Sequence, residues 1–203
     1  HTSEPQSSPW EYLRIAFKEK NIELGELISA SGARCWLFSG YDTNNKREVA
    51  VKVEKVWQAK ESGKTGFAYA LDRAVEEWRE AGLFEHSNPN IVKIFDAGTI
   101  DVNIKGLNIG IHYQILELFG DKDIGEAIRN KNFSGLGIIK TLEGIIAWVN
   151  SFIWLYDKGL ARSDFDTSNF MVALTGVRAG TIKQVDLDTI GFNRRKYTPV
   201  PVS

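Results

Sequence analysis

The sequence predicts an α+β fold with two unlike lobes, a strand-rich first lobe and a mainly helical second lobe. Two observations support this prediction. Runs rich in β-branched and aromatic residues are concentrated before residue 118, and the longest stretch with helical periodicity follows them, at about 136–158. Strands followed by helices are typical of α+β architectures, and no internal repeat indicates another arrangement.

The first lobe is predicted to begin with a short amphipathic helix. The dipeptide Ser8-Pro9 can cap such a helix, and Trp10, Leu13 and Phe17 follow at helical spacing. A longer helix is expected over about 68–85, because its apolar residues also recur at helical spacing. The strands expected in this lobe are 22–29, 35–41, 49–53, 91–95 and 109–118.

Two helices are predicted in the second lobe, a short one over 121–130 and a long one over about 136–158. Ser134 is the expected N-cap of the long helix, and Gly159 is expected to end it. Short strands are expected at 170–174 and 182–185.

Composition excludes several classes of protein. The 203 residues include 25 Lys+Arg and 26 Asp+Glu, and a net charge of -1 does not favour a nucleic-acid partner held by charge. Cys35 is the single cysteine, which excludes an intrachain disulfide framework and a multi-cysteine zinc site. The most apolar stretch, Gly144 to Tyr156, is interrupted by Asn150 and Ser151, so no membrane span is expected.

Lys52 lies inside the apolar strand predicted at 49–53. Because an unpaired buried ammonium is costly, Lys52 either points to water from an edge strand or has an anionic partner. The helix that follows offers Glu76, Glu77 and Glu80 as partners. Such a pair would let the lysine hold an anion.

Two acidic segments follow the long helix. Asp164 and Asn169 lie in one loop, and Asp186 and Asp188 follow the strand predicted at 182–185. Carboxylate and amide oxygens are hard ligands suited to Mg²⁺. The ordered set of a glycine turn, a strand lysine, a helix glutamate, Asp-x4-Asn and a strand aspartate is more specific than any one of these elements.

In this order the residues resemble the motifs of the protein kinase superfamily, over about Ile22 to Phe192. Residues 49–52 resemble the V-A-I-K strand, and residues 30–37 match the glycine-rich loop with only Gly32 of its glycines kept. The resemblance implies a kinase-like fold in which Gly32 and Lys52 contact the nucleotide phosphates.

The resemblance extends to the segments around the predicted nucleotide. Residues 88–92 resemble the H-P-N-I-V segment, and counting back from it makes Glu80 the expected partner of Lys52, with Glu76 and Glu77 as alternatives. Residues 115–120 resemble the hinge. The resemblance implies that Leu116 guards the back of the adenine pocket and that the Glu117 carbonyl and the Phe119 amide face the adenine.

The catalytic residues are also implied by resemblance. Residues 162–169 resemble H-R-D-L-x-x-x-N, and residues 186–188 stand at the D-F-G position. Asp164 would accept the proton of the substrate hydroxyl, while Asn169, Asp186 and Asp188 would hold metal. The implied cofactors are ATP and Mg²⁺, and the implied reaction is phosphoryl transfer to a Ser or Thr hydroxyl of a protein.

The domain organisation implied is a flexible tail at 1–8, an N-lobe with its preceding helix at 9–118, and a truncated or minimal C-lobe at 119–203. The expected partner is a protein substrate or a regulatory protein. The expected location is the cytoplasm, including that of a host cell if the chain is a secreted bacterial effector.

Departures from the family pattern keep two alternatives open. Ala30 and Cys35 replace two loop glycines, and Asp166 places a negative charge where Ser/Thr kinases usually carry a lysine. Together with the short C-lobe, these departures favour a pseudokinase that acts as a binding or regulatory scaffold. Asp188 replaces the glycine of D-F-G, and this D-x-D is similar to aminoglycoside and choline phosphotransferases, which favours a small-molecule kinase.

Overall fold

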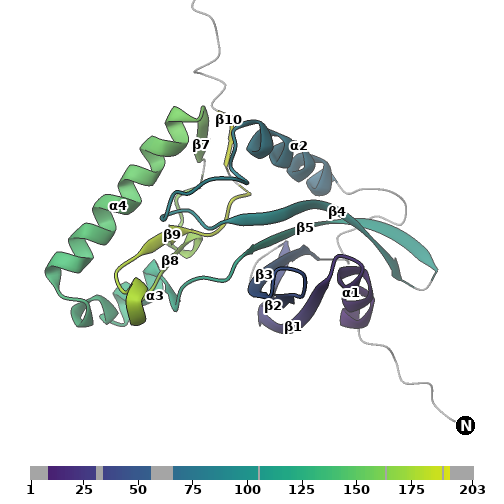
Figure 1. Ribbon diagram of the computed structural model, residues 1–203, viewed down its shortest axis with the longest axis horizontal. Coiled ribbons are helices and arrows are strands. Elements are labelled where there is room, and N and C mark those ends of the chain that lie inside the picture. The colour runs from purple at the N-terminus through teal and green to yellow at the C-terminus, as the bar shows by residue number, and fades with distance from the viewer. Residues whose placement is uncertain are drawn as a thin grey trace, which may run out of the picture. The chain divides into compact units, whose positions relative to one another are not determined.

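The computed structural model describes residues 9–30, 34–55, 66–104, 106–162, 164–188 and 190–192 (Figure 1). It contains a strand-rich sheet and a smaller number of helices, so the predicted α+β class is confirmed. The tail expected at 1–8 and the expected phosphate ligand Gly32 lie outside the described residues.

The chain divides into two compact units. The first contains the described residues up to Val75 together with Ile94–Leu118. The second contains Glu76–Lys93 and the described residues from Phe119 onward. The chain therefore changes unit after Leu118, but the segment 76–93, expected in the first lobe, groups with the second unit.

The first unit is built on a five-stranded antiparallel sheet with the strand order β1-β2-β3-β5-β4. The strands are β1 (Ile22–Ser29), β2 (Cys35–Asp42), β3 (Arg47–Glu54), β4 (Ile94–Ile104) and β5 (Leu107–Glu117). Helix α1 (Pro9–Lys18) packs its buried Leu13 and Phe17 into the apolar core on one face of this sheet.

The strand predicted at 91–95 begins later than expected, at Ile94, and continues to Ile104 as one arm of a long hairpin with β5. Ile91 instead forms an isolated parallel bridge with Gln184 of the second unit. The amide of Val92 donates to the Gln184 carbonyl across 3.0 Å. The backbone of 91–92 is thus hydrogen-bonded to another strand, which local sequence could not predict.

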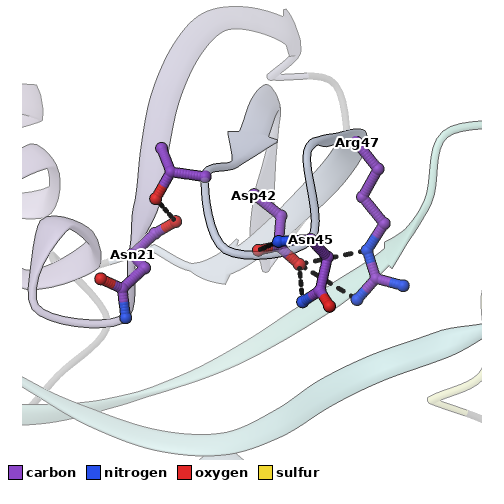
Figure 2. Close-up of polar contacts among 5 residues, drawn as sticks. Asn21, Asp42, Asn45 and Arg47 are labelled. Atoms are coloured by element: carbon purple, nitrogen blue, oxygen red, sulfur yellow. Dashed lines mark hydrogen bonds and ion pairs between the residues drawn. The ribbon is translucent and has the colours of Figure 1, made fainter.

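The turn between β2 and β3 is organised by the buried Asp42 carboxylate (Figure 2). Asp42 accepts hydrogen bonds from Asn45 N (3.0 Å), Asn45 Nδ2 (2.8 Å) and Arg47 Nε (3.1 Å). Burial acts to raise the pKa of Asp42, but the hydrogen bonds from Asn45 and the charge of Arg47 outweigh it and lower the pKa. The arrangement fixes the entry into β3.

Among the described residues, the second unit combines three α-helical segments with short strands and 3₁₀ turns. Its helices are the last residues of α2 (Gly66–Glu80), α3 (Ile124–Arg129) and α4 (Ile138–Asp157). Its strands are β6 (Lys122–Asp123), β7 (Leu160–Arg162), β8 (Phe170–Val172), β9 (Ile182–Gln184) and β10 (Ile190–Phe192). Strands β6, β8 and β9 form one sheet, and β7 pairs with β10.

Helix α4 begins later than predicted. Gly137, not Ser134, occupies the N-cap position, and no side chain caps the helix there. Ser134 lies in a 3₁₀ turn (Asn132–Gly135) and donates its hydroxyl to the Lys131 carbonyl across 2.7 Å, which explains why it does not cap α4. The end predicted at Gly159 agrees with its positive φ of 76°.

Asn150 and Ser151 do not interrupt α4. Ser151 is buried, donates to the Trp148 carbonyl (2.6 Å) and accepts from Gln184 Nε2 (2.7 Å), so its hydroxyl is satisfied. Among the described helices, α4 is the one long and apolar enough to cross a membrane by length and composition. A single helix of this kind is weak evidence for a span.

Candidate functional site

The loop from Asp164 to Asn169 is held by its own side chains. Asp164 Oδ1 accepts the amide of Asp166 across 3.0 Å, and Asp166 Oδ1 accepts the amide (2.8 Å) and hydroxyl (2.6 Å) of Ser168. The buried Asn169 donates its Nδ2 to Asp164 Oδ2 across 3.0 Å. Both carboxylate oxygens of the exposed Asp164 are therefore oriented by donors, and two of the predicted site residues are in direct contact.

The Asp186–Asp188 segment is tied to the same loop through the backbone. The amide of Val185 donates to the Asn169 carbonyl across 3.0 Å. The residue directly before Asp186 is therefore hydrogen-bonded to Asn169. Asp186 Oδ1 accepts the amide of Asp188 across 3.2 Å, and Leu187 between them is fully buried. The local turn thus holds both carboxylates at one end of β9.

Arg162 stands at the first position of the segment that resembles H-R-D-L-x-x-x-N, and the sequence prediction assigned it no role in the site. It is the last residue of β7 and pairs in register with Ile190 of β10, two residues beyond Asp188. Only 6% of the residue is exposed, and its Nε donates to the Asp164 carbonyl across 2.5 Å. Its guanidinium carbon lies 4.9 Å from the ring centroid of Phe170. A polar residue immediately before the loop was visible in the sequence, but its burial was not.

The guanidinium of Arg162 lies in a field of three carboxylates. Burial lowers the pKa of Arg162, and the charges of Asp186, Asp164 and Asp188 partly oppose that effect. Nη1 and Nη2 are buried and have no hydrogen-bond partner among the described residues. Because arginine keeps its proton even when buried, this position carries a permanent positive charge.

The donor set of this region suits Mg²⁺. Nδ2 of Asn169 is engaged by Asp164, which leaves its Oδ1 as the amide atom available to a cation. Among the described residues, no group of three or more His, Cys, Asp or Glu side chains is placed to hold a metal by itself. Mg²⁺ commonly takes only one or two protein carboxylates and completes its shell with water and substrate phosphates. Asp186, Asp188 and Asn169 fit that mode.

Asp166 carries a fixed negative charge beside Asp164. The side-chain and backbone hydrogen bonds from Ser168 hold the pKa of Asp166 below its ordinary value, against a small opposing effect of burial. Asp166 is therefore ionised at neutral pH. Asp166 stands where Ser/Thr kinases usually carry a lysine, and it is an ordered residue with a negative charge.

Lys52 lies in the central strand of the first unit. Strand β3 is paired with β2 on one side and β5 on the other, so the alternative of an edge-strand lysine is wrong. Lys52 is opposite Leu37 and Gln114, and Ala50 is opposite Leu116. Because paired residues share a face and alternate residues along a strand do too, Lys52 and Leu116 lie on the same sheet face.

This face also contains buried polar groups that the sequence prediction missed. Glu54, His112 and Gln114 are each 1% exposed or less. Glu54 Oε2 accepts the amide of His112 across 3.1 Å, and the side chains of Gln114 and His112 approach to 3.2 Å. The recurrence of polar residues at 52 and 54 of an apolar strand was the signal available in the sequence.

The three helix glutamates differ in their surroundings. Glu80, the expected partner of Lys52, is exposed at the last residue of α2, and Glu76 is exposed and pairs with Arg79 Nη1 at 3.0 Å. Glu77 is partly buried, and a Cβ built on Gly191 of β10 would lie 3.0 Å from its Oε2. Glu77 is therefore the most buried of the three helix glutamates.

The residues predicted at the hinge are placed as follows. Leu116 is buried in β5, and Glu117 is the last residue of that strand. Phe119 is 9% exposed in the second unit, where Lys183 Nζ lies 4.9 Å from its ring centroid. The Phe119 side chain thus has a packing role in its own unit.

No family model and no curated protein matches this chain.

Proposed function

We propose that this protein is an ATP- and Mg²⁺-dependent phosphotransferase of kinase-like fold that phosphorylates Ser or Thr hydroxyls of a protein. The observation that supports this most strongly is the hydrogen bond from Asn169 to Asp164 within a loop whose Asn169 carbonyl also binds Val185. The bond from the Val185 amide to the Asn169 carbonyl links the Asp-x4-Asn segment to the Asp-x-Asp segment, which lies apart from it in the sequence.

Each residue has a role in this proposal. Asp164 accepts the proton of the attacking hydroxyl, because its carboxylate is exposed and oriented by two donors. Lys52 binds the nucleotide phosphates. Asn169, Asp186 and Asp188 would hold Mg²⁺, which when bound neutralises charge on the transferring phosphoryl group.

Nucleotide-dependent thermal stabilisation tests this function. ATP with Mg²⁺ should raise the Tm, because a ligand that binds only the native state stabilises it. Lys52→Met should reduce that rise, while Lys18→Met, an exposed lysine on α1 of the same unit, should not. The absence of any shift at millimolar nucleotide in the unmodified protein would contradict the proposal.

One observation favours a second candidate, a pseudokinase that binds a regulatory protein partner. The ordered and ionised Asp166 places negative charge two residues from the proposed base, where it would repel a phosphoryl group. A scaffold would bind its protein partner without transferring phosphate. Asp166→Lys should then leave transfer absent, whereas in an active kinase the same change should maintain or raise the rate.

A further inference from the structure

Helix α4 presents an apolar and exposed face along nearly its whole length. The residues of this face recur at alternating spacings of three and four, which is the heptad pattern of a coiled-coil seam. Each is between 47% and 70% exposed, although apolar side chains of this size are usually buried. They are Ile139, Leu142, Ile146, Val149, Ile153 and Tyr156, and we call them the α4 seam.

The rotation of α4 about its axis is fixed by the opposite face of the helix. There Gly144 packs so closely on Gly180 that a Cβ would lie 2.1 Å from the carbonyl oxygen. The buried Ser151 accepts a hydrogen bond from Gln184 Nε2 across 2.7 Å, and Leu155 is 1% exposed. These contacts hold α4 on its own unit, so the α4 seam is not the side by which the helix packs there.

The two edges of the α4 seam differ in chemistry. One edge carries Glu143, Asn150 and Asp157, which recur every seven residues and are all exposed. The other edge continues the apolar surface with Ile138 and Ile145, which are also exposed. Side chains at these edge positions set partner choice in coiled coils, because they pair with side chains of the facing helix. The acidic edge therefore calls for positive charge on the partner.

A second copy of the chain does not supply that charge. In an antiparallel pair of α4 helices the acidic edges would face each other, and in a parallel pair each acidic edge would face an apolar edge. Neither orientation places a cation beside Glu143 or Asp157. A lipid surface also fits poorly, because helices that lie on membranes carry Lys and Arg beside the apolar face. A helix with basic side chains beside its own apolar seam satisfies both features.

We propose that the α4 seam is a docking site for an amphipathic helix of another protein, with Ile or Leu along its seam and Lys or Arg beside it. Burial of the exposed aliphatic side chains supplies the affinity. Pairing of the partner's cations with Glu143 and Asp157 supplies the specificity. This docking requires neither nucleotide nor phosphoryl transfer, so it is independent of the proposed function.

Two synthetic helical peptides test the chemistry of the partner. A peptide of about three heptads, with Ile and Leu along its seam and Lys on both edges, should bind the unmodified protein in a fluorescence anisotropy titration. The same peptide with Glu in place of Lys should bind about tenfold more weakly. Glu143→Lys combined with Asp157→Lys should reverse this preference. Equal binding of the two peptides, or no binding of the lysine peptide, would overturn the proposal.

Variants of the α4 seam locate the binding. Ile146→Ser combined with Ile153→Ser should weaken the lysine peptide at least about tenfold, and the Tm should change little because both side chains are more than half exposed. Val177→Ser changes a fully exposed apolar residue of the same unit outside α4, and it should bind like the unmodified protein. Equal binding by the seam variant would overturn the proposal.

Two measurements on the unmodified protein distinguish the other occupants. Sedimentation velocity should give a monomer, and phosphatidylcholine vesicles should not retain the protein. A dimer that the seam variant abolishes would assign the α4 seam to a second copy of the chain. Vesicle binding that the seam variant abolishes would assign it to lipid. Either result would overturn the proposed partner.

Discussion

The side-chain amide of Asn169 donates a 3.0 Å hydrogen bond to Asp164 Oδ2, so that a buried residue orients an exposed carboxylate five positions before it. The amide has a single orientation in this contact, because its Nδ2 must face the carboxylate. The contact therefore links the stability of the loop to the position of the Asp164 carboxylate.

Asn169→Ala should lower the free energy of unfolding by about 1–3 kcal/mol, because it removes a buried amide together with its hydrogen bond to Asp164. Urea denaturation measures this change. Asn130→Ala is the matched control: Asn130 is exposed, and its side chain makes a longer bond of 3.4 Å to Glu126, so little loss is expected. Equal effects of the two substitutions would contradict a special role for Asn169.

Asp164→Asn should reduce phosphoryl transfer by at least about 100-fold, because the amide cannot accept the proton of the substrate hydroxyl. The ATP-dependent rise in Tm should stay nearly unchanged, since Asp164 is not assigned to the nucleotide. Radiolabelled transfer and thermal shift on the same preparation measure the two effects. Retained turnover would remove Asp164 as the base.

Asp186→Asn should weaken the Mg²⁺-dependent part of the ATP-induced Tm shift, because a neutral amide is a poorer ligand for this cation. Asp188→Asn is the matched comparison, since its carboxylate lies in the same turn. Thermal shift with ATP, with and without Mg²⁺, measures both variants. A larger loss of metal dependence in Asp188→Asn would move the main ligand role to Asp188.

Asp42 predicts a pH dependence of stability. Its pKa is lowered in the folded state, so the stabilisation that it contributes is present above the unfolded pKa of about 3.9 and is lost as pH falls through the folded value. Asp42→Asn should therefore cost stability at neutral pH and cost less at about pH 3. Urea denaturation at both pH values tests this, with the exposed Asp101→Asn as control. A pH-independent cost would contradict the linkage.

Gly144→Ala tests how α4 is packed. An alanine normally stabilises a helix interior relative to glycine by about 0.5–1 kcal/mol. Here a Cβ on Gly144 would lie 2.1 Å from the Gly180 carbonyl oxygen, so the sign should reverse and the Tm should fall. Gly135→Ala, where no atom lies within 4 Å of the new Cβ, should have little effect. A stabilised Gly144→Ala variant would show that α4 does not pack in this way.

Much of the secondary structure could be predicted because its signals are local. β1 matches the predicted range, and α4 differs from its predicted limits by two residues at the start and one at the end. The prediction failed where distant backbone takes part. Ile91 pairs with Gln184 instead of starting a strand, and β4 continues to Ile104 because β5 returns along it.

The sequence by itself determined the positions of the acidic motifs and of the strand lysine, because spacing and residue type are local properties. Only the tertiary structure decided that Lys52 lies in a central strand, that Asn169 binds Asp164, and that Arg162 is buried and donates to the Asp164 carbonyl. Those outcomes depend on strand pairing and burial between segments far apart in the chain. The energy of a buried charge is set by that surrounding structure, which no local pattern encodes.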